Sequence, residues 1–292
     1  MMNRQPLRLA ISEAAKILAE AGVDSPRVDA EYLAAHVLGV ERGRLPLIPL
    51  VDPPVVDQLH KLVRTRASRV PLQHILGWAP MGSISVEVGP GVFVPRPETE
   101  LLMEWSLKAL AGVSAPVVVD LCTGTGALAL SIAAARPDAV VHAVEIDPQA
   151  LAWTRRNADA RVAAGDTPIR LHSGDATDPS LLSDLDGQVD LVVCNPPYVP
   201  EGTPVQPEVG VHDPHHAVFS GQDGLDVIRH VVRAAARWLK PGGSVGIEHD
   251  DTQGESVPAL LSARRVLTDV ADHQDLAGRP RFATARRVQG GQ

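Results

Sequence analysis

Aromatic residues, cysteines and long apolar runs are all scarce in this sequence. Phe, Trp and Tyr together make up 3% of the 292 residues, so Ala and Val must supply most of the hydrophobic core. No stretch approaches about eighteen consecutive apolar residues, so no transmembrane helix is expected. The segment Met1–Arg8 also lacks the apolar region of a secretory signal. We therefore expect a globular protein with no membrane association.

The only two cysteines are Cys122 and Cys194, and each follows an apolar segment. This placement favours buried free thiols in a reducing compartment over a disulfide. We therefore expect a cytoplasmic protein.

The net charge of −8 disfavours a protein whose main task is to grip duplex nucleic acid. The charge is uneven, because residues 1–75 carry +2 and the remainder carries −10. A basic run near residue 65 comprises Lys61, Arg64, Arg66 and Arg69. A solvated helix face is the preferred interpretation of this run, and a surface for an acidic or phosphate-bearing partner is the alternative.

The first part of the chain has the apolar spacing of short helices. Segments 6–21 and 54–68 show a helical period, and a further helix should open at Pro26 behind a Ser25 cap. We expect a compact helical N-terminal domain over residues 1–75. Residues 76–95 should form a linker with a β-hairpin, since apolar and polar residues alternate from Ile84 to Val88.

Strands and helices alternate from residue 116 onward, which predicts an α/β domain over residues 96–292. This pattern is typical of a doubly wound, mostly parallel sheet. The expected strands are 116–121, 139–144, 169–172, 189–194, 244–247, 266–270 and 281–287, and the expected helices are 127–135, 148–160 and 223–239.

A polar segment stops the apolar strand Val189–Cys194. Pro196 and Pro197 cannot extend a ladder, so Asn195 should lie at the carboxyl end of the strand, where open α/β sheets bind ligands. The Asn195 amide offers an acceptor and a donor, and the Pro196 carbonyl has no local partner. With Tyr198 as a flat wall, these groups could clamp an NH2 group. An Asx-type turn is the alternative.

Asp120 and a glycine-containing turn follow the first strand of the α/β domain. The glycines of Thr123-Gly124-Thr125-Gly126 let the backbone approach a ligand, and the next helix points its positive end at it. This turn fits dinucleotide-binding enzymes and S-adenosylmethionine enzymes equally well.

The next two strand ends favour the second class. Glu145 and Ile146 follow one strand, where the acid could accept hydrogen bonds from ribose hydroxyls, and Asp175 and Ala176 follow the next, where they could bind adenine. Together with Asp120, these acids would repel a pyrophosphate but suit a cationic adenosyl ligand. The sequence therefore predicts a methyltransferase that uses S-adenosylmethionine.

Two segments carry a resemblance to a known family. Asn195–Tyr198 matches the (Asn/Asp)-Pro-Pro-Tyr motif of class I methyltransferases that modify amino or amide nitrogen. Together with Pro95–Glu100, which reads Pro-Arg-Pro-Glu-Thr-Glu, it resembles the HemK-type protein N5-glutamine methyltransferases, which act on peptide chain release factors. Further matching segments are 69–77, 220–225, 241–243 and 253–255.

The resemblance implies a seven-stranded class I sheet, S-adenosylmethionine as methyl donor and S-adenosylhomocysteine as product. It implies a target glutamine in the Gly-Gly-Gln motif of class 1 release factors, with no direct nucleic-acid substrate, and we expect a monomer. Asn195–Tyr198 would hold the target amide, Asn195 would also touch the cofactor, and the N-terminal helices would help to dock the factor. The implied cofactor contacts are Arg96, Thr99, Asp120, Thr123, Gly124, Gly126, Glu145, Ile146, Asp175 and Ala176.

The sequence departs from the family pattern at a few positions. Cys122 stands where the family usually has glycine, and Glu248-His249-Asp250 replaces Glu-Ile-Gly. None of these changes removes a residue of the expected site.

Other functions fit parts of the pattern. An exocyclic amino group of DNA or RNA would suit the same clamp, but no basic target-recognition region is evident. A glutamine of a ribosomal protein is a closer alternative. An adaptor that only binds cofactor or release factor would not need the Asn195 clamp.

Three remaining features carry little weight. The cluster His212–His216 fits no usual metal motif, so no metal is expected. The loop 199–221 is long enough to be a substrate-facing lid. The terminal Gly290-Gly291-Gln292 repeats the target tripeptide, which we take as coincidence.

Overall fold

The structure is a computed structural model that describes residues 4–289. The terminal Gly290–Gln292 tripeptide lies outside the described residues. The chain divides into two compact units. The first comprises the chain up to Trp78 together with Gln206–His212, and the second comprises Ala79–Val205 together with the chain from Asp213 onward. The predicted domain boundaries at residues 75 and 95 remain predictions.

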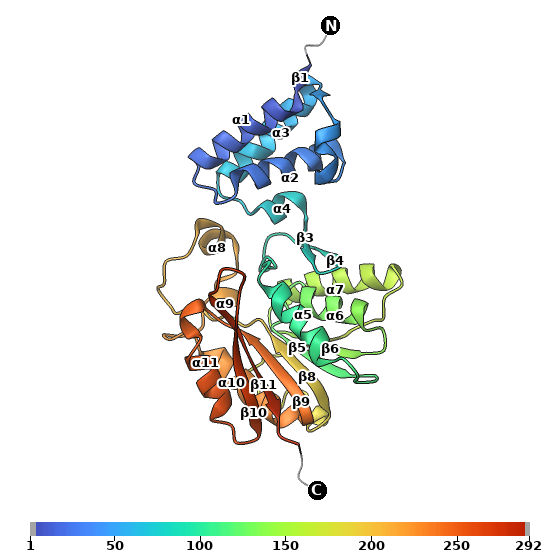
Figure 1. The fold of residues 1–292 in the computed structure, drawn as a ribbon, viewed down its shortest axis with the longest axis vertical. Helices are drawn as coiled ribbons and strands as arrows, with labels where there is room; N and C mark the ends of the chain where they lie inside the picture. Colours follow the sequence, from blue (N-terminus) through green and yellow to red (C-terminus); the bar gives the residue numbers. More distant parts are fainter. Residues whose placement is uncertain (1–3, 290–292) are drawn as a thin grey trace. The chain divides into compact units, whose positions relative to one another are not determined.

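The first unit is helical, as predicted (Figure 1). Its apolar core joins α1, α2 and α3 around residues such as Leu18, Leu33 and Leu59, all fully buried. Ser25 occupies the N-cap position of α2, but its side chain forms no capping hydrogen bond. The helices are α1 (Leu7–Glu20), α2 (Pro26–Leu38), α3 (Pro53–Ala67), α4 (Leu72–Leu76) and α8 (Pro207–His212), with a 3-10 helix at Arg42–Leu47 and a short strand pair β1 (Gln5–Pro6) and β2 (Leu50–Val51).

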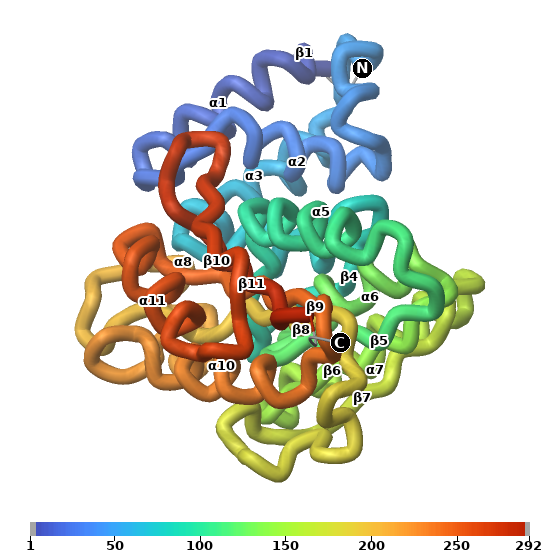
Figure 2. The backbone as a smooth tube through the Cα atoms, turned by 60° about the horizontal axis from the view of Figure 1, so that its bottom comes forward, coloured from blue at the N-terminus to red at the C-terminus, as the bar shows by residue number. Residues whose placement is uncertain are grey.

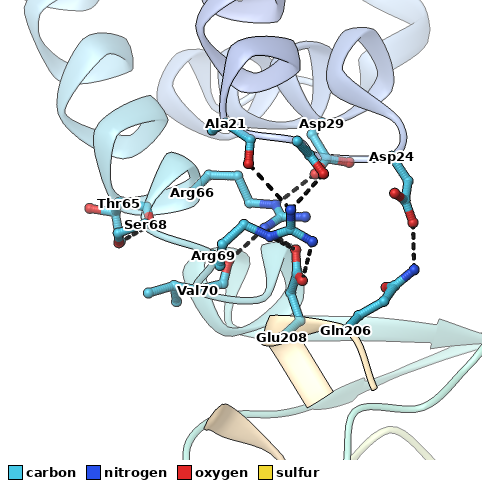
Figure 3. A network of polar contacts seen from close by, with 11 residues as sticks. Ala21, Asp24, Asp29, Thr65, Arg66, Ser68, Arg69, Val70, Gln206 and Glu208 are labelled. Carbon is cyan, nitrogen blue, oxygen red and sulfur yellow. Dashed lines mark hydrogen bonds and ion pairs between the residues drawn. The ribbon is translucent and has the colours of Figure 1, made fainter. Parts of the chain in front are cut away.

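A buried ion-pair network corrects the interpretation of the basic run (Figure 3). Arg66 is buried, with Nε 2.7 Å from Asp29 Oδ2 and Nη1 2.7 Å from Glu208 Oε1. Arg69 also donates to Glu208, from Nε at 2.8 Å. Only Lys61 and Arg64 are exposed. The run is therefore not one solvated face, because two of its arginines neutralise carboxylates inside this unit.

The second unit contains the predicted seven-stranded sheet. Its order is β10-β11-β9-β8-β5-β6-β7, and all neighbouring pairs are parallel except those of β11. The strands are β5 (Val117–Leu121), β6 (Val140–Glu145), β7 (Arg170–Ser173), β8 (Val189–Cys194), β9 (Leu239–Glu248), β10 (Leu267–Gln274) and β11 (Pro280–Arg287). Strand β9 begins earlier than predicted, since Leu239 already pairs with Val189.

Helices cover both faces of the sheet (Figures 1 and 2). One apolar core joins the sheet to α5 and α6, and the other joins it to α10 and α11. Helix α11 was not predicted, and α10 begins three residues later than expected. The helices are α5 (Thr99–Ala109), α6 (Ala127–Ala135), α7 (Pro148–Ala163), α9 (His215–Val218), α10 (Asp226–Trp238) and α11 (Ser256–Ser262).

Two connecting regions differ from the sequence prediction. Strands β3 (Trp78–Met81) and β4 (Ile84–Glu87) pair as the expected two-stranded sheet, but α4 was not anticipated in the segment before them. The expected lid 199–221 contains the short helices α8 and α9, and its segment Gln206–His212 belongs to the helical unit. Within residues 4–289, no helix is long and apolar enough to cross a membrane.

Candidate active site

The carboxyl ends of four parallel strands lie next to one another in the sheet. Strand order β8-β5-β6-β7 brings Asn195, Asp120, Glu145 and Asp175 to one edge, each at or just beyond the end of its strand. This is the edge at which open α/β sheets bind ligands. The structure therefore brings together the polar residues that the sequence singled out.

The turn between β5 and α6 has an unusual backbone. Cys122, Gly124 and Gly126 all have positive φ, at 57°, 59° and 81°. The Thr154 hydroxyl donates to the Gly124 carbonyl at 2.6 Å, and the Asn157 amide donates to the Thr125 carbonyl at 2.9 Å. Helix α7 therefore holds the turn in a conformation that favours glycine.

Asp120 lies beneath this turn. Its Oδ2 accepts hydrogen bonds from the Thr123 hydroxyl at 2.6 Å and from the Ala129 N–H at 3.2 Å. Burial raises the pKa of the Asp120 carboxyl to about 7, although these hydrogen bonds act in the opposite direction. The side chain therefore joins the turn to the first residues of α6, and its contact with a cofactor stays a prediction.

Two further acids are held by backbone N–H groups. Glu145 Oε2 accepts from the Gly124 N–H at 2.8 Å, and its Oε1 accepts from the N–H groups of Ile146 and Asp147. Asp175 Oδ1 accepts from Thr177. These bonds fix the direction of both carboxylates at the sheet edge.

An adenosyl ligand suits the chemistry of this edge. The Ile146 side chain is 55% exposed, beside Glu145, and offers an apolar surface to a flat ring. A Cβ on Gly124 would meet no atom within 4 Å, so the space above the turn is open. Carboxylates, an open glycine and an exposed apolar side chain together fit a cationic nucleoside better than a pyrophosphate.

The predicted clamp forms hydrogen bonds to two other elements. Asn195 Nδ2 lies 3.1 Å from the hydroxyl oxygen of Thr99, the first residue of α5. The Tyr198 hydroxyl donates to Glu248 Oε1 at 3.2 Å, and the Gln253 amide donates to the Tyr198 carbonyl at 2.9 Å. The contact with Thr99 leaves the Asn195 side-chain oxygen as the acceptor of the predicted clamp.

Arg96 is held by a residue of the long loop. Its guanidinium forms an ion pair with Asp213 and lies 4.8 Å from the centre of the Phe93 ring. Asp213 also accepts from the Val94 N–H at 3.3 Å. Asp213 therefore orients the segment that carries Arg96.

The chain is similar to known proteins over most of its length. Residues 10–77 match the family model described as the PrmC N-terminal domain, and residues 86–210 match the one described as the methyltransferase small domain. A release factor glutamine methyltransferase of Mycolicibacterium smegmatis is 52% identical over 282 residues, covering 97% of this chain and 98% of the relative. One from Mycobacterium tuberculosis is 50% identical over 285 residues, covering 96% and 91%.

The chain belongs to the release factor glutamine methyltransferase family. The predicted activity, methyl transfer to a glutamine nitrogen of release factors, is the one for which this family is named, so the prediction of family and enzyme class is confirmed. A solved T. thermophilus 16S rRNA N2 G1207 methyltransferase shares the fold, with a TM-score of 0.51 and 23% identity over 72% of this chain and 49% of that chain.

Several residues around the site of this family member were not predicted from the sequence. Glu248 was noted only as part of a departure from the family pattern, and Asp213 only as part of a histidine cluster. The position of Glu248 at the end of a buried strand was a usable signal, since the other site acids follow strands too. Nothing in the sequence indicated that Gln253 would reach the Tyr198 carbonyl.

Proposed function

We propose that this chain transfers a methyl group from S-adenosylmethionine to the side-chain amide nitrogen of the glutamine in the Gly-Gly-Gln motif of class 1 release factors. The observation that carries this proposal is the orientation of Asn195. Its Nδ2 faces the Thr99 hydroxyl, so its oxygen remains free to accept a hydrogen bond from a substrate NH2 group. The proposal also takes the protein to be a cytoplasmic monomer.

The cofactor would lie along the carboxyl edge of β5, β6 and β7. Thr123, Gly124 and Gly126 would pass beneath its methionine part. Glu145 would hold the ribose, and Ile146 would pack on the adenine ring. At the edge of that ring, Asp175 would accept a hydrogen bond and the Ala176 N–H would donate one. Arg96 and Thr99 would border the cofactor on the other side. This assignment is supported by the exposed Ile146 side chain and by the open space at Gly124.

The reaction requires orientation more than a strong base. An amide nitrogen is a weak nucleophile, because its lone pair is delocalised into the carbonyl group. When bound, S-adenosylmethionine supplies a methyl group whose bond to sulfur breaks as the bond to nitrogen forms. The Asn195 side-chain oxygen and the Pro196 carbonyl would accept the two amide hydrogens and align the nitrogen.

The same acceptors favour the transition state. Positive charge develops on the nitrogen during transfer, and fixed acceptors near that charge lower the barrier. Tyr198 and Pro197 would border the amide and exclude water, while the proton would leave through Asn195 or solvent after transfer. Because Tyr198 is held at both its hydroxyl and its carbonyl, it can provide this wall without rearrangement.

The test is transfer of a labelled methyl group to purified release factor. Arms with the Gln→Ala release factor, with a ribosomal protein and with DNA or RNA separate the alternative substrates. Asn195→Ala should keep most of the cofactor affinity and lose about 100- to 1000-fold in kcat, the usual effect of removing one transition-state partner. Gln188→Ala is the control, since it removes an exposed amide. Wild-type rates with Asn195→Ala, or label in nucleic acid alone, would overturn the proposal.

A further inference from the structure

A buried glutamine side chain lies against the end of the Asn-Pro-Pro-Tyr segment. Gln253, the last residue of a 3-10 helix at Asp251–Gln253, is 4% exposed. Its Nε2 donates to the Tyr198 carbonyl at 2.9 Å and to the Asp223 carbonyl at 3.1 Å. Its Oε1 accepts from the Asp250 N–H at 2.9 Å. Both amide hydrogens and the amide oxygen of Gln253 are therefore engaged, each with a backbone group.

These partners fix the orientation of the Gln253 amide. A glutamine side chain carries two N–H donors and one carbonyl acceptor. Two of its backbone partners are carbonyls, which only accept, and the third is an N–H, which only donates. A turned amide would place its oxygen against a carbonyl and its NH2 group against an N–H. Gln253 is therefore a fixed link between Tyr198 and two other segments of the chain.

The Tyr198 carbonyl is also enclosed on the side of Gly224. A Cβ on Gly224 would lie 2.1 Å from the Tyr198 carbonyl oxygen and 2.7 Å from Gln253 Nε2. Only a residue without a side chain allows so close an approach. The Tyr198 main chain therefore has little room to shift while Gln253 holds it.

The residue after Tyr198 is held by the far end of the loop 199–221. The Val199 N–H donates to the Val218 carbonyl, and the Val199 carbonyl accepts from the Ser220 N–H, both at 3.0 Å. These bonds join the two ends of the loop at its base. Gln253 adds a side-chain link one residue earlier in the chain, where the clamp ends and the loop begins.

We propose that Gln253 is a positioning residue for methyl transfer, which acts through the Tyr198 main chain to hold the Tyr198 ring beside the target amide. This inference rests on the proposed function and adds a residue to it. The ring has a second anchor, because its hydroxyl donates to Glu248 at 3.2 Å.

The two anchors act together on the ring. When the carbonyl anchor is lost, the ring is fixed only at its hydroxyl and no longer has one position against the amide. Misalignment of the reacting groups slows the transfer step. None of the three backbone partners of Gln253 belongs to a residue assigned to the cofactor, so cofactor affinity should not change.

The first test compares two substitutions of Gln253. Gln253→Glu keeps the shape and the acceptor for Asp250, but it donates at most one hydrogen bond in place of two. Gln253→Met removes all three polar contacts. With release factor as substrate, we expect kcat to fall about tenfold in each, the equivalent of one hydrogen bond, with unchanged affinity for S-adenosylhomocysteine. Gln188→Met, at an exposed position, is the matched control. Thermal unfolding of each variant verifies that it is folded.

The second test asks whether Gln253 acts through the Tyr198 ring. Tyr198→Ala should lower kcat, and Gln253→Met should add no further loss in that background, because there is no ring left to position. Additive losses, a wild-type kcat in both Gln253 variants, or a loss of cofactor affinity instead of kcat would overturn the inference. The proposed function would survive each of these results, because it depends on Asn195→Ala and on the labelled substrate.

Discussion

Asn195 Nδ2 and the Thr99 hydroxyl oxygen lie 3.1 Å apart, although the residues are separated by 96 positions in the chain. Thr99 opens α5 from the Pro-Arg-Pro-Glu-Thr-Glu segment, and Asn195 opens the Asn-Pro-Pro-Tyr segment. The two most specific sequence signals therefore meet in one hydrogen bond. The first turn of α5 thus contacts the proposed substrate clamp directly and is not merely a helix start beside it.

The two glycines of the turn after β5 should respond differently to alanine. Both have positive φ, so each substitution should cost about 1–2 kcal/mol of folding free energy. A Cβ on Gly126 would also lie 2.8 Å from Thr154 Cγ2, whereas one on Gly124 meets nothing within 4 Å. Gly126→Ala should therefore be the less stable variant in urea unfolding.

Cofactor binding, in contrast, should respond more to the substitution at Gly124 than to the one at Gly126. Gly124→Ala places its methyl group in the open space assigned to the cofactor, so it should weaken S-adenosylhomocysteine binding in a calorimetric titration while remaining well folded. Unchanged affinity in Gly124→Ala would mean that the cofactor does not pass over this glycine.

The pH dependence of stability should report the buried Asp120. Its pKa is raised to about 7 in the folded protein, from a usual value of 3.8, because burial disfavours the charge. Between these values the folded state binds more protons than the unfolded state. The contribution of protonated Asp120 to the free energy of unfolding is therefore complete below about pH 4. It is lost as pH rises through about 7, at about 1.4 kcal/mol per pKa unit.

Asp120→Asn removes this titration. The free energy of unfolding of the variant, measured relative to the wild type in urea melts, should therefore increase as pH rises from 5 to 8. A difference that stays constant across this range would show that Asp120 has an ordinary pKa.

The helical unit should depend on Arg66. The Arg66 guanidinium forms ion pairs with Asp29 and with Glu208, which Arg69 also neutralises. Arg66, Asp29 and Glu208 are all buried (Figure 3). Arg66→Met leaves the buried Asp29 carboxylate without its ion-pair partner and leaves Glu208 with Arg69 alone. Loss of one partner of a buried ion pair typically costs about 3–5 kcal/mol. Hydrogen exchange of the α3 amides measures this unit directly.

An exposed pair provides the comparison. Arg27 and Glu31 form an i,i+4 ion pair on α2 with much greater exposure, so Arg27→Met should cost only about 0.5 kcal/mol or less. Equal loss of protection in the two variants would rule out a special role for the buried network.

The strand ends were predictable because they depend on local patterns. Asn195, Asp120, Glu145 and Asp175 each follow an apolar strand, and parallel strands bring their carboxyl ends to one edge whatever the remaining packing. Helix α6 and strand β8 agree residue for residue with the predicted bounds, since Gly126 and Pro196 mark their limits in sequence.

The contacts that orient these residues could not be predicted in the same way. The Tyr198–Glu248 and Arg96–Asp213 contacts join residues 50 and 117 positions apart, and no periodicity carries such pairings. The basic run was misinterpreted for the same reason. Arg66 is charged but lies on the buried face of α3, with Leu59 and Val63. The distant carboxylates of Asp29 and Glu208 make its burial favourable.

Cys122 offers the clearest gain in stability. Its φ of 57° lies in the left-handed region, which costs a residue with a Cβ about 1–2 kcal/mol. Cys122→Gly relieves that strain but adds backbone freedom to the unfolded chain, worth about 0.4–1 kcal/mol. The net expectation is a gain of about 0.5–1 kcal/mol in the free energy of unfolding. Cys122→Ala loses the thiol and keeps the strain, so urea unfolding should find it less stable than Cys122→Gly. Equal stabilities of the two variants would show that the backbone at this position is unstrained.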